Sequence, residues 1–272
     1  MYFSESYDKI KCLMIEKALL SYTGDENMSG HSKWNNIKRK KEKTDGQKAK
    51  IFTKIGRELA MAVREGGSGD PAVNSRLKDA IAKAKANNVP NDNIDRIIKK
   101  ASGEGNSDAY EAIQYEGYGP SGVAVIVETL TDNRNRTAGD LRHYFDKFGG
   151  NLGTTGCVSF MFQKKGVIVI EAEGLDEDAV MEAALEAGAS DFQSDGDVFE
   201  IFTEPEDFSA IRDELAEKYT FVSADVEQVP DTYTAITDPD LIVKMGRLLE
   251  MLEDDDDVQS VWHNWENADD AE

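Results

Sequence analysis

The sequence predicts an α+β protein of three domains: an N-terminal three-helix domain, then two ferredoxin-like α/β domains, one inserted in the other. Three observations predict this class. The chain has 272 residues, more than one small hydrophobic core requires. Apolar residues recur with a period near 3.6 over residues 45–100 and with a strand period after Tyr110. From residue 166 the predicted elements follow the order β, α, β, β, α, β that is typical of a ferredoxin-like unit.

The helical stretch is expected to hold three helices. Ile51, Ile55 and Leu59 fall on one face of the first helix, and two glycines follow its end. An Asp cap and a Pro at the first helical position open the second helix, and Asn and Pro stop it. The first helix is expected to end at Glu65, the second to start at Pro71 behind the cap Asp70, and the third to run over about 91–100, followed by a linker over 102–107.

The α/β part is expected to begin with a hairpin whose second strand is the branched run 123–127. The elements expected after it are a helix over 137–148, a strand over 157–162, a strand over 166–171, a helix over 175–187, a hairpin over 191–203, a helix over 205–219, a strand over 221–228, a helix over 238–252 and a strand over 258–265. The last helix and strand supply what the first unit lacks, so we expect one unit to interrupt the other.

Four divisions of the chain follow from this order and from composition. They are an N-terminal extension over 1–27, disordered or not native; a basic helical domain over 28–108; a ferredoxin-like domain over 109–165 plus 230–272; and an inserted ferredoxin-like domain over 166–229. No apolar run is long enough for a membrane span, and residues 1–27 lack the features of a signal or transit peptide. We therefore expect a cytoplasmic protein.

Charge is distributed unevenly along the chain. The net charge of −22 divides into −2 for residues 1–27, +8 for 28–108 and −28 for 109–272. Residues 33–57, here called the basic segment, hold ten Lys and Arg against two acidic residues. Cations neutralise phosphates, and the ring of Trp34 could stack on a base, worth about 1–3 kcal/mol. The candidate nucleic-acid-binding residues are His31, Lys33, Trp34, Lys38, Arg39, Lys40, Lys41, Lys43, Lys48, Lys50, Lys54 and Arg57.

The alternative is that the basic segment is a solvated charged arm and that Trp34 packs on the helical domain. Residues 109–272 carry a charge of −28, and charges are screened beyond about 8–10 Å at physiological salt. The basic segment therefore cannot attract a distant polyanion effectively. Binding would then need close docking rather than long-range steering.

A second group of cations, Arg134, Arg136 and Arg142, lies where a strand meets a helix and could receive a phosphate or an RNA backbone. Capping by Thr137 or Asn135, with ion pairs to local carboxylates, is the favoured interpretation of this group. The acidic run, residues 253–257, is unfavourable at a helix C-terminus. We expect that helix to end near Leu252 and the acidic run to be solvated and to bind no metal.

Catalytic and metal-binding patterns are missing from the sequence. His31, His143 and His263 are scattered, and Cys12 and Cys157 follow no ligand spacing. A calcium-like stretch that starts at Asp191 has Phe202 where the closing Glu is required, so a hairpin turn is expected there. Residues 149–153 are expected to form a helix C-cap and turn rather than a phosphate cradle. No catalytic residue, metal, cofactor or small-molecule substrate is expected.

Several ordered motifs resemble the YebC family. They are residues 28–37, which include His-Ser-Lys-Trp-Asn, then residues 49–54, Tyr-Glu-Gly-Tyr-Gly-Pro over 115–120, Thr-Asp-Asn-Arg-Asn-Arg-Thr over 131–137, and Gly-Gly-Asn-Leu-Gly over 149–153. The resemblance implies a cytoplasmic protein of one helical and two α/β domains with no known enzymatic activity. Members are described as DNA-binding transcriptional regulators and as ribosome-associated translation factors, including a mitochondrial translational activator.

The sequence therefore predicts a non-enzymatic, nucleic-acid-binding regulator of gene expression that resembles YebC-type DNA-binding transcriptional regulators. The alternative is a translation factor that binds ribosomal RNA and the ribosome and assists elongation. The lack of a helix-turn-helix, ribbon or zinc-finger pattern favours RNA on the residues alone. An enzyme of unrecognised chemistry is the weakest hypothesis.

Overall fold

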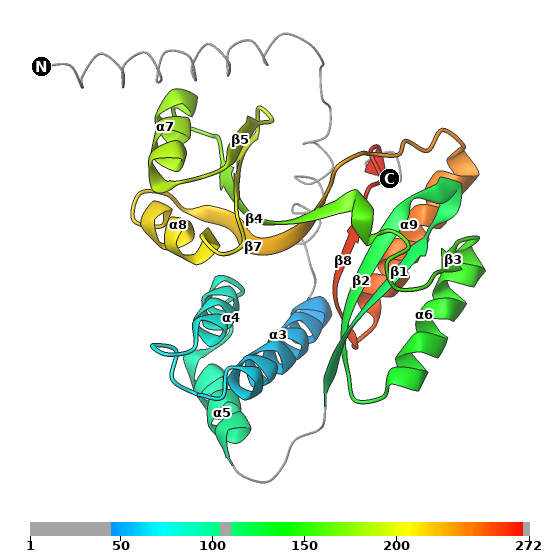
Figure 1. Cartoon of the computed structure of the whole chain (residues 1–272), viewed down its shortest axis with the longest axis horizontal. Coiled ribbons are helices and arrows are strands. Elements are labelled where there is room, and N and C mark those ends of the chain that lie inside the picture. Colours follow the sequence, from blue (N-terminus) through cyan, green and yellow to red (C-terminus); the bar gives the residue numbers. More distant parts are fainter. Residues whose placement is uncertain (1–44, 104–109, 269–272) are drawn as a thin grey trace, which may run out of the picture.

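The computed structural model describes residues 45–103 and 110–268. These residues form seven α-helices and two four-stranded antiparallel sheets, so the α+β class is confirmed (Figure 1). The helices α3–α5 form one part, and each sheet with two helices forms another. We call the two sheets the outer sheet and the inserted sheet, because the strands of the second lie between those of the first in the sequence.

The helical part contains α3 (Asp45–Glu65), α4 (Ser75–Ala86) and α5 (Asn91–Ser102). The expected apolar face of α3 packs on α4 and α5, where Leu59 and Leu77 are completely buried.

The start of α4 differs from the expected position at Pro71. Asn74 is the cap: its side-chain oxygen accepts from the Leu77 N–H at 3.0 Å, and its amide donates to the Ala62 carbonyl at 2.9 Å. Asp70 instead closes a turn by accepting from the Ala72 N–H. Asn74 serves both helices at once, which local sequence does not reveal.

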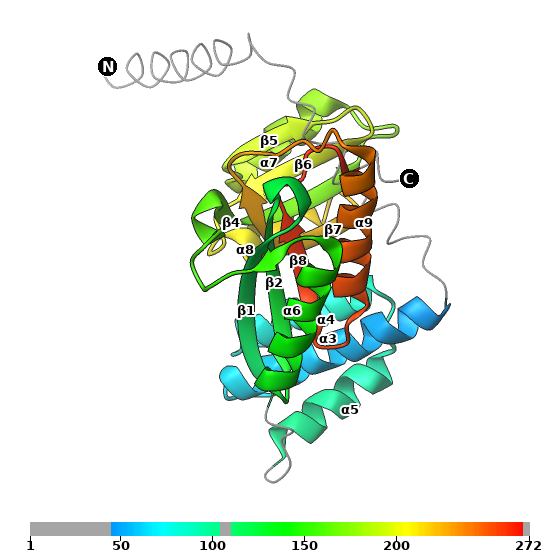
Figure 2. The same ribbon diagram turned by 90° about the vertical axis from the view of Figure 1, so that its right-hand side faces the viewer.

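The outer sheet has the order β3-β1-β2-β8, built from β1 (Glu111–Tyr118), β2 (Ala124–Thr131), β3 (Asn151–Leu152) and β8 (Val258–His263). The turn η1 (Pro120–Gly122) joins the two central strands. The helices α6 (Arg134–Phe148) and α9 (Pro239–Asp254) lie side by side on one face of this sheet (Figure 2). Val125, Phe145 and Met245 are buried in the core between sheet and helices.

The inserted sheet has the order β5-β6-β4-β7, which is that of a ferredoxin-like unit. Its strands are β4 (Phe162–Glu171), β5 (Asp191–Ser194), β6 (Val198–Thr203) and β7 (Phe221–Pro230), and its helices are α7 (Glu177–Ala187) and α8 (Phe208–Leu215). Ile168 and Ile201 pack under these helices, whereas Val169 and Phe202 lie on the other face. The expected domain boundary at residue 166 falls inside β4.

The strand expected over 157–162 does not form. The turn η2 (Ser159–Met161) occupies half of this stretch, and Phe162 begins β4 of the inserted sheet. The carboxylate of Glu116, which is only 2% exposed, accepts hydrogen bonds from the backbone N–H groups of Gly156, Val158 and Ser159, each at 2.9 Å. A carboxylate thus takes the backbone donors that a strand ladder would use. The expected C-cap before this stretch is confirmed, since Gly149 adopts φ 83°.

Candidate nucleic-acid interface

The structure describes only part of the basic segment. His31, Lys33, Trp34, Lys38, Arg39, Lys40, Lys41 and Lys43 lie outside the described residues. Lys48 lies in the first turn of α3, and the side chains of Lys50, Lys54 and Arg57 are described further along the same helix. The second cation group, Arg134, Arg136 and Arg142, lies on α6.

Lys50, Lys54 and Arg57 share one face of α3 and lie against the acidic run. Their spacing of four and three residues places them on one side of a helix. Lys50 Nζ lies 3.0 Å from Asp254 Oδ1 and 3.2 Å from the Asp254 carbonyl oxygen. Lys54 Nζ donates to the Glu253 carbonyl oxygen at 2.7 Å. Arg57 Nη1 donates to the Asp256 carbonyl oxygen at 2.6 Å and to Asp257 Oδ1 at 3.1 Å.

The acidic run is exposed at Glu253, Asp254 and Asp256, as expected, but α3 contacts it and its last residue, Asp257, is buried, which was not expected. The helix α9 continues to Asp254, two residues beyond the expected end, and Asp257 is 5% exposed. The C-terminus of a helix carries unpaired carbonyl groups and a partial negative charge, which the added carboxylates increase. Three cations from α3 compensate this charge, so a run of five acidic residues is tolerated here.

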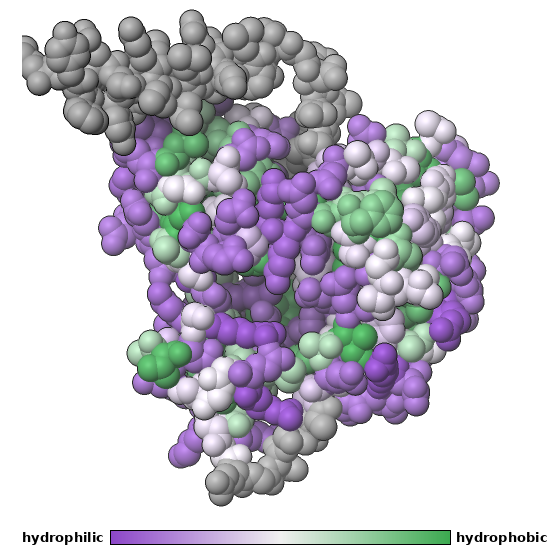
Figure 3. All heavy atoms as spheres, viewed as in Figure 1, coloured by the Kyte–Doolittle hydropathy of each residue, from purple (hydrophilic) through white to green (hydrophobic). Residues whose placement is uncertain are grey.

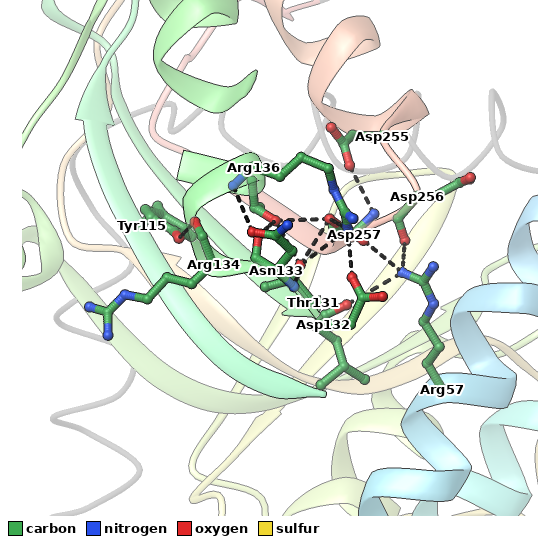
Figure 4. Close-up of polar contacts among 12 residues, drawn as sticks. Arg57, Tyr115, Thr131, Asp132, Asn133, Arg134, Arg136, Asp255, Asp256 and Asp257 are labelled. Carbon is green, nitrogen blue, oxygen red and sulfur yellow. Dashed lines mark hydrogen bonds and ion pairs between the residues drawn. The ribbon is translucent and has the colours of Figure 1, made fainter. Parts of the chain in front are cut away.

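Asp257 is the centre of a buried polar cluster that joins three segments of the chain (Figure 4). Its Oδ2 accepts from Thr131 Oγ1 at 3.0 Å, from Thr137 Oγ1 at 2.8 Å and from Arg136 Nη2 at 2.7 Å. Its Oδ1 accepts from Arg57. Burial alone would raise the pKa of Asp257, but the hydrogen bonds from Arg136, Thr137 and Thr131 outweigh it and lower this pKa. The carboxylate thus stays ionised inside the cluster.

The neighbouring carboxylate, Asp255, fixes the same loop from the other side. Its Oδ2 accepts from Tyr144 Oη at 3.1 Å, and its Oδ1 accepts from the Asp257 N–H at 2.8 Å. Burial, together with the charge and the hydrogen bond of Asp255, raises the pKa of Tyr144 to about 12. The loop after α9 is therefore held by α3, by the start of α6 and by the middle of α6.

The motif over 131–137 has a structural role in this cluster. Asn133 caps α6 by accepting from the Arg136 N–H at 3.1 Å, so the expected cap, Thr137 or Asn135, is wrong. Thr137 is instead completely buried against Asp257. The expected ion pairing with a local carboxylate is confirmed, because Arg136 lies 2.8 Å from Asp132 Oδ1.

The second cation group thus divides. Arg136 is held by Asp132 and Asp257, as described above. Arg134 has a side chain 68% exposed and lies 3.7 Å from Glu111 Oε1, and Arg142 is exposed. Arg134 and Arg142 are thus the more exposed members of this group, although Arg134 already faces Glu111.

Cations of α4 also face acidic groups. Lys78 pairs with Asp213 of α8 at 2.5 Å, and Lys83 lies 3.2 Å from Glu58 and 3.4 Å from Asp225 of β7. A further pair has its charges reversed: the cation, Arg212, belongs to α8 and lies 2.9 Å from Asp79 of α4. These pairs border a cleft of about 2270 Å³ between the three parts, and the molecule is hollowed there (Figure 3). Much of the positive charge of α3 and α4 therefore holds the domains together.

Asp257 and its acidic neighbours were missed as partners of the basic segment by sequence reasoning. Their pairing is hidden by sequence distance, because Asp257 lies 200 residues from Arg57 and 120 from Thr137 along the chain. The unusual position of an acidic run at a helix C-terminus was the one available sign that cations must lie nearby.

Two further observations concern the described residues alone. None of the helices of residues 45–103 and 110–268 is both long and apolar enough to cross a membrane. In the same part of the chain, no group of three or more His, Cys, Asp or Glu side chains is placed to hold a metal ion.

Comparisons with known proteins cover nearly the whole described structure. The profile of the TACO1/YebC protein N-terminal domain matches residues 32–104, and that of the TACO1/YebC second and third domain matches residues 110–265. A probable transcriptional regulatory protein of Acetivibrio thermocellus is 64% identical over 240 residues, which cover 88% of this chain and 99% of that protein. A protein of the same description from Ruminiclostridium cellulolyticum is 61% identical over 247 residues, which cover 90% of this chain and 99% of that protein.

A solved structure supports the fold assignment. The crystal structure of a conserved hypothetical protein from Aquifex aeolicus superposes with a TM-score of 0.75 at 42% sequence identity. The match covers 82% of this chain and 92% of the other.

Proposed function

Since the chain belongs to the TACO1/YebC family, in which close relatives are described as probable transcriptional regulatory proteins, we propose that it is a non-enzymatic regulator that binds nucleic acid through its basic segment. The proposal places the protein in the cytoplasm and gives it DNA as its partner, with neither a cofactor nor a small-molecule substrate. The two cysteines, far apart in the sequence, suit a reducing compartment.

The observation that carries the proposal is how the charge of the basic segment is divided. Lys50, Lys54 and Arg57 already contact the acidic run. Ahead of them, residues 33–48 hold seven cations, Lys33, Lys38, Arg39, Lys40, Lys41, Lys43 and Lys48, against Glu42 and Asp45. A net charge of +5 beside Trp34 provides both phosphate neutralisation and base stacking. The primary contact is therefore proposed for residues 33–48.

Ribosomal RNA is the second candidate target, and one feature of the helical part favours it. The helix α5 follows α4 after a short turn, as a recognition helix would, but its exposed start carries Asp92 and Asp95. Recognition helices contact bases with their N-terminal residues, where phosphates would repel these carboxylates. Contacts with single-stranded or irregular RNA do not require a helix in the major groove.

The test is ultraviolet crosslinking in cells, followed by sequencing of the attached nucleic acid. The test variant replaces Lys38, Arg39, Lys40 and Lys41 with Ala. The matched control replaces four exposed lysines elsewhere with Ala: Lys85, Lys99, Lys100 and Lys244. The expected result is a loss of crosslinks of about tenfold or more in the test variant and little loss in the control.

The identity of the crosslinked material separates the two targets. Enriched promoter DNA supports transcriptional regulation, and enriched ribosomal RNA supports the translation alternative. Equal losses in both variants, or no nucleic acid above background with the wild type, would overturn the proposed function. In vitro, engagement of about five phosphates on duplex DNA predicts a log–log salt slope near −4 to −5.

A further inference from the structure

The face of α3 that sequence assigned to nucleic acid is occupied by another part of the same chain. We propose that the acidic run is an internal competitor for nucleic acid: it closes the Lys50 and Lys54 positions, and a bound polyanion displaces it and takes them over. This inference rests on the proposed function and adds a regulatory contact to the same site.

The contacts made by the acidic run are those that a phosphate backbone would make. Lysine ammonium groups at Lys50 and Lys54 lie 2.7–3.2 Å from one carboxylate oxygen and two carbonyl oxygens. Phosphate oxygens accept hydrogen bonds from the same groups at similar distances. One lysine cannot direct its full charge both to the acidic run and to a phosphate. Binding of the acidic run and binding of nucleic acid therefore compete.

The two ends of this contact differ in how firmly they are held. At the inner end, Arg57 and Asp257 have side chains 19% and 8% exposed, and Thr131, Thr137 and Arg136 hold Asp257 independently of Arg57. The guanidinium of Arg57 also lies 5.2 Å from the centre of the Tyr110 ring. At the outer end, the Lys50 and Asp254 side chains are 43% and 57% exposed.

Exposed ion pairs exchange readily with water and salt, whereas the inner end would leave buried charges unpaired. The expected motion is therefore local: Lys50 and Lys54 leave the acidic run, and the Arg57–Asp257 contact remains as the fixed point. A ligand shifts such an equilibrium by as much as its affinities for the two states differ. Nucleic acid bound to residues 33–48 would favour the state in which Lys50 and Lys54 have left the acidic run, because each lysine could then contact a further phosphate.

The test removes the outer carboxylates and keeps the inner ones. In the full chain, Glu253→Gln, Asp254→Asn and Asp256→Asn are combined, while Asp255 and Asp257 are kept. The matched control removes three exposed carboxylates on and near α7, by Glu173→Gln, Glu182→Gln and Glu186→Gln. Both variants change the net charge equally, so the control measures the general effect of charge. Binding is measured by fluorescence anisotropy with a duplex DNA and with a hairpin RNA of about 20 nucleotides.

We expect the first variant to bind about fivefold or more tightly than the control, which is the lower end of typical coupling between two sites. Adding Lys50→Ala and Lys54→Ala should cancel this gain, whereas the same two changes in the wild type should have a smaller effect. Thermal unfolding by circular dichroism verifies that every variant is folded.

Each other outcome decides against the inference. If the first variant gains no more than the control, or if its gain persists without Lys50 and Lys54, the acidic run is not a competitor. When that happens while wild-type binding still depends on Lys38–Lys41, the proposed function stands and the competitor alone fails. If neither the wild type nor the first variant binds either probe, both fail.

Discussion

Glu116 and Asp257 are both almost completely buried carboxylates, 2% and 5% exposed, yet they are satisfied in different ways. Glu116 accepts three backbone N–H groups of a single loop, together with the Gln114 side chain. Asp257 accepts from two arginines and two threonines that belong to α3, to the end of β2 and to the start of α6. The first carboxylate shapes a loop, and the second joins domains.

The kind of donor at each carboxylate predicts how the site responds to a mutation. Neutral backbone donors hold Glu116, so removal of its charge leaves no other ion unpaired. Charged donors hold Asp257, so its removal takes one charged acceptor from Arg57, whose side chain is 19% exposed, and one from Arg136.

The largest effect is expected for Asp257→Ala. The free energy of unfolding should fall by about 3 kcal/mol, the lower end for a broken buried ion pair, because Arg136 can still reach Asp132 and solvent. Urea denaturation followed by circular dichroism measures this. Asp257→Asn, which keeps one acceptor oxygen, should lie between the wild type and Ala. A loss below about 0.5 kcal/mol would show that the cluster does not hold the domains together.

A smaller effect is expected for Glu116→Gln, because the side chain keeps its size and one acceptor oxygen. The new amide group faces backbone donors, so the unfolding free energy should fall by about 1–3 kcal/mol, the cost of an unsatisfied buried polar group. Hydrogen exchange should rise first at the amides of Gly156, Val158 and Ser159. Uniformly faster exchange across both sheets would contradict the local role of Glu116.

The pH dependence sharpens the same comparison. Burial raises the pKa of each carboxyl, but hydrogen bonds outweigh it, so the folded pKa lies below the ordinary 4.5 for Glu116 and 3.8 for Asp257. A lowered folded pKa contributes stability that is present above the ordinary pKa and lost as pH falls through the folded pKa. Stability should therefore decline below about pH 4.5. Urea titrations between pH 2 and 6 should show that Asp257→Asn flattens the part of the decline below 3.8.

The smallest effect is expected for Lys50→Ala, at the exposed end of the contact with the acidic run. Exposed ion pairs contribute about 0–1 kcal/mol and weaken with salt. The unfolding free energy should change by less than about 1 kcal/mol, and the change should vanish near 1 M NaCl. A salt-independent loss of several kcal/mol would place Lys50 in the structural cluster with Asp257.

Most helices and strands could be predicted from the sequence, because their apolar periods are local. The apolar face of α3 and the glycine cap after α6 are examples. Two of the errors arose where a side chain outside the expected element supplied the deciding bond. Asn74 replaced Asp70 as the cap of α4 because it also bonds to Ala62 near the end of α3. The strand expected over 157–162 does not form, because the Glu116 carboxylate binds backbone N–H groups of that stretch.

The candidate site follows the same division. Composition and spacing by themselves determined that the positive charge gathers at residues 33–57 and that Lys50, Lys54 and Arg57 share a helix face. Only the tertiary structure decided what that face contacts. The acidic run lies about 200 residues further along the chain and reaches α3 because α9 packs on the outer sheet and β8 pairs with β2. Charge can be counted from the sequence, but ion pairing depends on distances that only the folded chain sets.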